Sequence, residues 1–272
     1  MTFLDTPGHA AFTTMREASC FASDLIILVV ATDEGVQEQT VESIRIIQEY
    51  KKPFILVVTK VDKEQPNMDL IAQQLVRHNV FTDMVGGEVT TLQVSAHKKK
   101  GLDDLIDAVV LETEGLRPQS IPTGYAEGVV LESMTSKHKG CGILVMTLWG
   151  SLKKGDAVAI GKVYGKIRSM EILEGGRQKT VTEVGPSCPV ILYGIKEHPN
   201  PGDTLLGAKD ERHAKRLVEY RKEIEYDIRD RKELFEAAEE RRRERELYFQ
   251  ELLKEEQGGV EEEEEEEEES RG

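Results

Sequence analysis

Three short motifs in the first hundred residues combine polar side chains with turn-forming residues. They are Asp5-Thr6-Pro7-Gly8-His9, Thr59-Lys60-Val61-Asp62 and Ser95-Ala96-His97. Asp5 is a carboxylate that suits an outer-sphere role on Mg²⁺, and Gly8 lets a backbone N–H approach a phosphate group closely. Every residue of these motifs except Val61 is therefore a candidate for nucleotide binding.

The second and third motifs fit a guanine base. Asp62 can accept two hydrogen bonds from guanine N1–H and N2–H₂, a pattern that adenine does not reproduce. The alkyl stem of Lys60 can cover one face of the purine, and the N–H of Ala96 can donate to the base oxygen. His9 is then placed to orient a water for in-line attack on the γ-phosphate. The expected cofactors are GTP and Mg²⁺, with His9 as the catalytic residue.

A parallel sheet would bring these motifs together. Apolar runs alternate with helical patterns, the runs at 2–4, 25–31, 54–58 and 90–94 and the patterns at about 10–22, 37–50, 68–76 and 102–111. Two of the runs are apolar on both faces, as strands covered by helices on each side are. This βα repetition predicts an α/β domain with a parallel sheet and right-handed crossovers. Because ligands bind at the carboxyl ends of such strands, Asp5, Asp33, Asp62 and Ser95 should converge on one rim.

The pattern changes after residues 115–124, whose Pro, Gly and Ser content indicates a linker. Short β-rich runs separated by turns then follow, at 126–132, 143–148, 157–160, 162–173, 178–184 and 190–193. Regular short strands with turn residues between them predict an antiparallel β-barrel or sandwich. Trp149 is expected in its core.

The last quarter of the chain is dominated by charged residues. Residues 208–257 contain no Gly or Pro and predict one long charged helix, in which Leu217, Tyr220 and Ile224 are spaced to pack against the body. Nine consecutive glutamates at 261–269 repel one another, which predicts a disordered acidic tail over 258–272.

Composition narrows the class of protein. The net charge is −15, yet residues 124–203 hold ten Lys/Arg against eight Asp/Glu, so an RNA-facing surface remains open there. The three cysteines lack paired spacing, which predicts neither structural zinc nor disulfides and favours a reducing compartment. No apolar run approaches the roughly 18 residues that a membrane span requires.

These motifs carry a resemblance to a known family. "FLDTPGHAAF", "TKVD", "VSAHKKKGLDDLIDAV", "GVVLESM", "GSLKKGD" and "NPGDTLLGAKDERHAKRLVEYR" resemble bacterial-type translation initiation factor two, the initiator-tRNA GTPase of bacteria and organelles. The resemblance covers residue 2 to about residue 221. It implies a GTPase domain over 1–117, a translation-factor β-barrel over 118–207, and then the helix and tail.

Two departures from the family pattern accompany the resemblance. No GxxxxGK[ST] motif occurs in the 272 residues, so the family's phosphate-binding loop and first switch are expected before residue 1, and its tRNA-binding domains after the helix. Thr59 replaces the asparagine of the family's NKxD motif, which removes an amide contact to the base and leaves Asp62 in place.

The resemblance implies a monomer that works on the small ribosomal subunit with its rRNA and initiator tRNA, with neither DNA nor membrane as partner. A mitochondrial setting is favoured over the bacterial cytoplasm by the unusual tail. The alternative is a degenerate, nucleotide-free homologue that binds the ribosome or assists its assembly. Ser95 also fits a helix cap, the run Lys98–Lys100 a solvated loop, and the barrel lysines 137, 139, 153 and 154 either rRNA phosphates or solvent.

Overall fold

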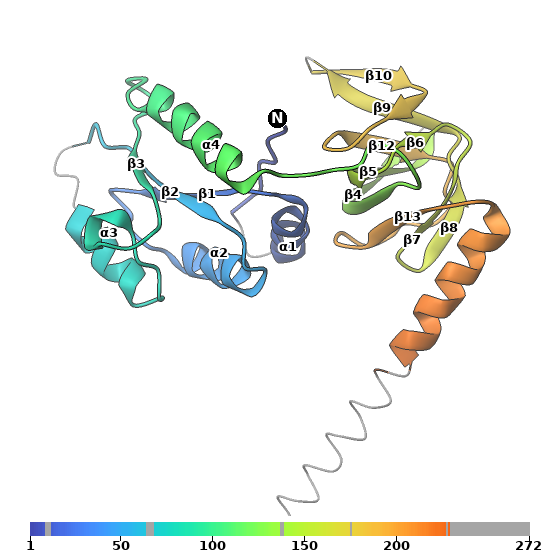
Figure 1. Ribbon diagram of the computed structural model, residues 1–272, viewed down its shortest axis with the longest axis horizontal. Coiled ribbons are helices and arrows are strands. Elements are labelled where there is room, and N and C mark those ends of the chain that lie inside the picture. The colour runs from blue at the N-terminus through green and yellow to red at the C-terminus, as the bar shows by residue number, and fades with distance from the viewer. Residues whose placement is uncertain (9–11, 64–67, 137–138, 175, 227, 229–272) are drawn as a thin grey trace, which may run out of the picture. The chain divides into compact units, whose positions relative to one another are not determined.

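The computed structural model describes residues 1–8, 12–63, 68–136, 139–174, 176–226 and 228. Residues 1–218 form one compact unit, which contains a parallel sheet followed in the chain by an antiparallel one (Figure 1). Within the described part of the chain, no helix has the length and apolar character needed to cross a membrane.

The parallel sheet has three strands in the order β1-β2-β3. They are β1 (Ile26–Ala31), β2 (Phe54–Thr59) and β3 (Thr91–Gln93), with Ile26 opposite Phe54 and Leu56 opposite Thr91. The helices of this part are α1 (Thr13–Ala22), α2 (Glu38–Glu49), α3 (Met68–Val76) and α4 (Leu102–Leu116), with a short 3₁₀ turn, η2 (Asp83–Val85). The parallel α/β arrangement predicted from the sequence is confirmed.

Helices cover both faces of this sheet because its strands are apolar on both sides. Leu28, Val30, Leu56 and Val58 pack with side chains of α2 and α3 in one cluster. On the opposite face, Ile55 and Val57 pack with Val109 of α4 in a second cluster. The strands are thus held in a three-layer arrangement that fixes their carboxyl ends.

The strand expected at residues 2–4 is wrong. Residues 1–8 form no strand. Thr2 Oγ1 donates to the carbonyl of Ser187 at 2.6 Å, and Leu4 packs against a cluster that includes Ala18 of α1 and Leu131 of the second sheet. Leu4 therefore packs without strand pairing, while Phe3 is exposed.

The second sheet has eight antiparallel strands in the order β10-β9-β12-β5-β4-β13-β7-β8, and a small ladder pairs β6 with β11. The bounds are β4 (Glu127–Ser136), β5 (Gly140–Trp149), β6 (Leu152–Lys153), β7 (Ala157–Ile160), β8 (Val163–Lys166), β9 (Ser169–Glu174), β10 (Arg177–Val181), β11 (Glu183–Val184), β12 (Pro189–Tyr193) and β13 (Thr204–Ala208). The sequence analysis missed β6 and β13, the latter pairing with both β4 and β7.

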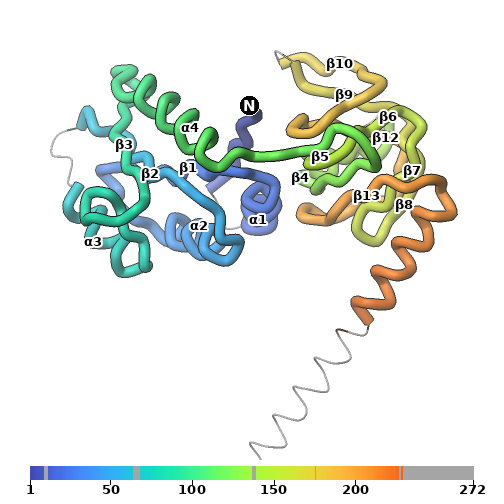
Figure 2. Tube along the Cα trace, in the orientation of Figure 1, coloured from blue at the N-terminus to red at the C-terminus, as the bar shows by residue number. Residues whose placement is uncertain are grey.

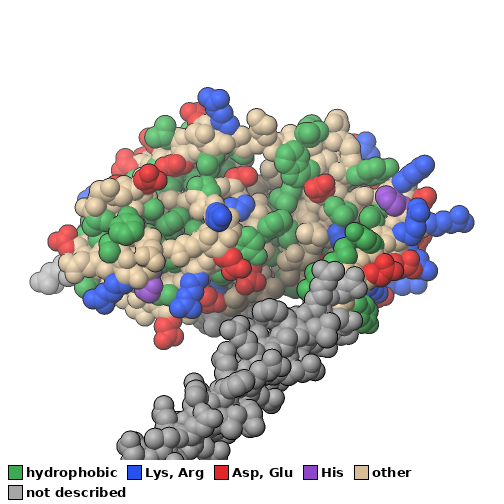
Figure 3. All heavy atoms as spheres, turned by 60° about the horizontal axis from the view of Figure 1, so that its bottom comes forward, with side chains coloured by type: hydrophobic (Ala, Val, Ile, Leu, Met, Phe, Trp, Pro, Cys, Tyr) green, Lys and Arg blue, Asp and Glu red, His purple; other side chains and the backbone are tan. Residues whose placement is uncertain are grey.

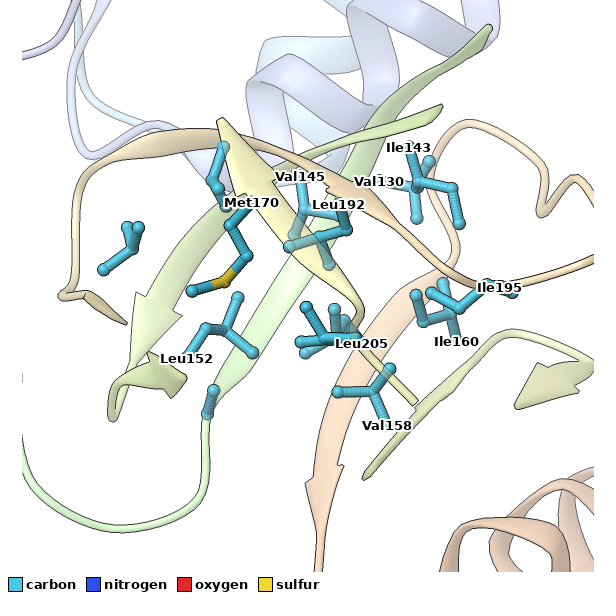
Figure 4. Close-up of a cluster of buried hydrophobic side chains, with 14 of the residues drawn as sticks. Val130, Ile143, Val145, Leu152, Val158, Ile160, Met170, Leu192, Ile195 and Leu205 are labelled. Atoms are coloured by element: carbon cyan, nitrogen blue, oxygen red, sulfur yellow. The ribbon is translucent and has the colours of Figure 1, made fainter. Parts of the chain in front are cut away.

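One buried hydrophobic cluster lies within this sheet, and Figure 4 shows part of it, with Val130, Met170 and Leu205 among the labelled side chains. Val163 of β8 and Met170 of β9 lie in the same buried cluster as Val145 and Leu192 near the middle of the sheet. Val181 of β10 packs against the same cluster, so the strands at both ends of the sheet share this core and the sheet curls around it. Trp149, expected in the core, is instead 41% exposed at the end of β5.

A helix follows the second sheet over residues 211–226. Ala214 and Val218 pack on Ala157, Ala159 and Ala208, with Leu217 beside them. Tyr220 and Ile224 are exposed. The rest of the predicted long helix and the acidic tail lie outside the described residues. Figure 2 follows the described part of the chain from the first sheet to the second.

Candidate functional site

Asp62 and Ser95 come together at the carboxyl ends of β2 and β3. Ser95 is fully buried, and its Oγ donates to Asp62 Oδ1 at 2.5 Å while accepting the N–H of Lys98 at 3.2 Å. The hydrogen bond from Ser95 lowers the pKa of Asp62. An aspartate is ionised at neutral pH and then only accepts hydrogen bonds, the form that guanine's two donors require; the contact with Ser95 fixes the position of its Oδ1.

The loop that carries Ser95 is closed at its base. Ser95 and Lys100 exchange two backbone hydrogen bonds of 3.0 Å, and Ala96 and His97 lie at the exposed tip. Ser95 does not cap the next helix, because the N-cap position of α4 is Gly101. Gly101 has φ of 73°, and a Cβ there would lie 2.2 Å from the carbonyl oxygen of Gln93, so this turn requires glycine.

Lys60 is held by carboxylates that follow the neighbouring strand. Its Nζ lies 3.0 Å from Asp33 Oδ1 and 2.6 Å from Glu34 Oε1, and Lys63 Nζ lies 2.5 Å from Asp33 Oδ2. Hydrogen bonds from Lys63 and Lys60 lower the pKa of Asp33 to about 2. The hydrogen bonds that Lys60 donates to Glu34 and Asp33 raise the pKa of Lys60. The lysine stem expected to cover the base is thus anchored at its tip.

The backbone at Lys60 is fixed as well. Lys60 has φ of 60°, an uncommon value for a residue with a side chain. Thr32 Oγ1, which follows β1, lies 3.2 Å from the carbonyl oxygen of Thr59 and 3.1 Å from that of Lys60. Thr59 Oγ1 donates to the carbonyl of Val30 at 3.4 Å, so this hydroxyl serves the strand pair β1–β2 rather than the base.

The turn Asp5–Gly8 is attached to α1 and α2. Asp5 is exposed, Thr6 is partly buried, and Arg16 of α1 donates to the carbonyls of Pro7 and Gly8 at 3.1 Å each. His9, the predicted catalytic residue, lies outside the described residues. The structure therefore brings together the two motifs predicted to read the base, and Arg16 anchors the turn predicted to face the phosphates.

Comparisons with known proteins find relatives of both parts of the chain. The model of the elongation factor Tu GTP binding domain matches residues 1–114, and that of elongation factor G domain 2 matches residues 125–208. Translation initiation factor IF-2 of Buchnera aphidicola (Schizaphis graminum strain) is 40% identical over 229 residues, 84% of this chain. IF-2 of Clostridium novyi is 40% identical over 223 residues, 82% of this chain. The chain belongs to the translational GTPases.

Solved structures of translational GTPases share the fold. GDP-bound aIF5B of Aeropyrum pernix matches 81% of this chain with a TM-score of 0.70 at 21% identity, over 45% of its own chain. The bacterial selenocysteine-specific elongation factor EF-Sec matches 74% with a TM-score of 0.58 at 22% identity, over 34% of its chain. This chain spans about a quarter to a third of the length of the two IF-2 relatives, 26% and 32%.

The residues of this translational GTPase fit Mg²⁺ that arrives with a nucleotide. Mg²⁺ in nucleotide sites keeps several waters and uses one or two carboxylates together with substrate phosphates. Asp5 supplies one exposed carboxylate at the phosphate-side turn. Among the described residues, no cluster of three His, Cys, Asp or Glu forms a complete protein cage for a metal. Asp5 would hold the Mg²⁺ ion through a water molecule, and the ion would neutralise phosphate charge.

Sequence reasoning missed the residues that hold the site in this translational GTPase. Asp33 was placed on the rim by its position after β1, but no role followed from that position. Arg16 and Glu42 gave no signal, because residues 26 apart on two helices meet only once the helices are packed.

Two of the lysines considered for rRNA contact pair with carboxylates in the second sheet. Lys139 pairs with the buried Glu171, and Lys153 Nζ lies 3.2 Å from Glu183 Oε1. On the face shown in Figure 3, acidic and basic side chains are interspersed. Lys137 lies outside the described residues. Lys139 and Lys153 remain 44% and 58% exposed, so rRNA contact by these lysines stays a prediction.

Proposed function

We propose that this chain contributes the guanine-binding and second domains of a translation initiation factor that binds GTP with Mg²⁺ and hydrolyses GTP on the ribosome. Asp62 reads guanine, the Lys60 stem covers the purine, and the loop at Ser95 and Ala96 contacts the base oxygen. Gly8 senses the γ-phosphate, and His9 orients the attacking water.

The single observation that carries the proposal is the Ser95–Asp62 contact. This hydrogen bond joins the ends of β2 and β3 and fixes the carboxylate of Asp62. A deprotonated carboxylate is the partner that distinguishes guanine from adenine. The names of the IF-2 relatives, at 40% identity, support initiation as the stage of translation.

The proposal extends to partners. The factor would bind the small ribosomal subunit through its rRNA, help to place initiator tRNA, and promote joining of the large subunit, acting as a monomer. A mitochondrial location remains part of the proposal, and imaging of a tagged protein tests it.

Nucleotide titrations test the proposal in a form that has a phosphate-binding loop. The extended chain carries, ahead of Met1, the segment that precedes the matching residues in the Clostridium novyi relative. It should bind GTP but not ATP at micromolar concentration and hydrolyse GTP faster with ribosomes. The 272 residues alone should show no micromolar GTP isotherm, because the loop supplies most of the phosphate donors.

The nucleotide-free alternative makes the opposite prediction for the extended chain. It expects ribosome co-sedimentation with no preference for guanine over adenine nucleotides. Equal GTP and ATP affinities in the extended chain would overturn the proposed function.

A further inference from the structure

A buried arginine holds the phosphate-side turn from behind. The Arg16 side chain is only 7% exposed, and its Nη1 donates to the carbonyl oxygens of Pro7 and Gly8 at 3.1 Å each. A planar guanidinium presents donors in a fixed fork, so it can hold two successive carbonyls at once. A lysine at this position would offer a single charged point on a flexible stem.

The other end of the guanidinium is fixed by α2. Arg16 Nη2 lies 2.5 Å from Glu42 Oε2 and 3.3 Å from Thr13 Oγ1, and Thr13 Oγ1 donates to Glu42 Oε1 at 2.5 Å. Hydrogen bonds from Thr13 and Arg16 lower the pKa of Glu42. The buried positive charge is therefore compensated, which a charge in this environment requires.

This contact sets the direction of a backbone donor. No peptide bond among the described residues is cis. In a trans peptide the C=O and the following N–H point in opposite directions. Because the carbonyl of Pro7 faces Arg16, the N–H of Gly8 points away from the guanidinium.

We propose that Arg16, held by Glu42, is a positioning residue that aims the Gly8 N–H at the terminal phosphate of a bound nucleoside triphosphate. The inference rests on the proposed function for the identity of the ligand. It adds a residue that touches neither nucleotide nor water and that acts through the backbone of the turn. Its first consequence, the ordering of Gly8, is measurable without any nucleotide.

The first measurement is the ¹⁵N relaxation of the Gly8 amide in the 272-residue chain. In the unmodified chain its order parameter should be near the rigid-backbone value of about 0.85, and it should fall below about 0.6 in Arg16→Lys and in Glu42→Gln. Arg45→Lys is the matched control, because Arg45 lies on the exposed face of α2. The control should leave the amide rigid.

The second measurement separates positioning from general stability. In the extended chain, Arg16→Lys should lower the GTP-over-GDP affinity ratio about tenfold while GDP affinity stays unchanged, since only the γ-phosphate contact is lost. A uniform loss of both affinities would make Arg16 merely structural and overturn the proposal.

A Gly8 amide that stays rigid in both Arg16→Lys and Glu42→Gln overturns the proposal. If Arg16→Lys does not fold, the order parameter of Gly8 in Glu42→Gln tests the proposal by itself. If the extended chain shows no guanine preference but Gly8 still loosens in the variants, the proposed function fails and the anchoring of the turn by Arg16 stands without its phosphate role.

Discussion

Ser95 Oγ lies 2.5 Å from Asp62 Oδ1, so one buried hydroxyl joins the loops that follow β2 and β3. The same hydroxyl accepts the N–H of Lys98, which leaves Ser95 little freedom to turn away. The orientation of Asp62 is therefore set by a residue 33 positions later in the chain. A reader of guanine needs such support, because a misdirected carboxylate loses the paired contact.

Replacing Ser95 by alanine should return the pKa of Asp62 toward the ordinary value of about 3.9. In the unmodified chain, the folded-state pKa of Asp62 is lowered. Asp62 therefore contributes stability that is present above its unfolded pKa and is lost as the pH falls through the folded value. The ¹³C shift of the Asp62 carboxyl during an acid titration of the 272-residue chain reports this. Ser43→Ala is the control, because Ser43 Oγ donates to the carbonyl of Gln39 within α2. An unmoved midpoint would show that Ser95 does not hold Asp62.

Asp62→Asn should shift base preference in the extended chain from guanine toward xanthine nucleotides. An amide N–H₂ would face guanine's own donors, with a penalty of roughly 2–4 kcal/mol against GTP from unpaired polar groups. Competition between GTP and XTP for the same site measures it. Unchanged affinities for both would mean that Asp62 does not read the base.

Most of the fold was predictable because the apolar pattern of the strands is visible in the sequence. β1 and β2 are apolar on both faces, and α3 was predicted with the bounds that the structure shows, Met68–Val76. The strand expected at 2–4 failed because an apolar run of three residues does not reveal whether it pairs or packs. β13 was missed because its short sequence, Thr204–Ala208, has a glycine inside it and weak alternation.

The candidate site was also predictable only in part. The motif residues Asp62 and Ser95 were predictable, since each follows a strand end where ligands bind in parallel sheets. The contacts that hold them were not, because Arg16–Glu42 and Lys60–Asp33 join residues from separate elements. Side-chain direction decides such contacts, and strand periodicity alone does not give it. Trp149 was misplaced for the same reason, since the end of β5 leaves its outer side uncovered.

Asp33 should titrate with a midpoint of about 2 in the 272-residue chain, because Lys63 and Lys60 both bond its carboxylate. Its stabilising contribution is complete above the unfolded pKa and disappears as the pH falls toward 2. Lys63→Met removes the larger influence and should raise the midpoint toward about 3.9. Carboxyl ¹³C titration measures both, with Lys51→Met as a distant control. A midpoint near 4 in the unmodified chain would contradict the ion pairs.

His9→Ala should leave GTP binding by the extended chain nearly intact, because the proposed partner of the imidazole is the attacking water. Ribosome-stimulated turnover should fall by about 10²-fold or more, the scale of losing a positioned catalytic group. Single-turnover hydrolysis with ribosomes, set beside equilibrium binding of a GTP analogue, separates the two effects. Parallel losses in binding and rate would assign His9 a structural role.

The packing of the helix at 211–226 predicts where the chain tolerates change. Val218 is 3% exposed in a cluster with Ala157, Ala159, Ala208 and Ala214, so Val218→Ala should lower the free energy of unfolding by about 1–3 kcal/mol. Tyr220, two residues on, is 62% exposed, and Tyr220→Ala should change it by no more than about 0.5 kcal/mol. A chain ending at Lys232 retains this whole cluster and should unfold at the same urea midpoint as the 272-residue chain. A lowered midpoint after that truncation, or a costly Tyr220→Ala, would show that residues beyond 218 stabilise the sheet through contacts other than this cluster.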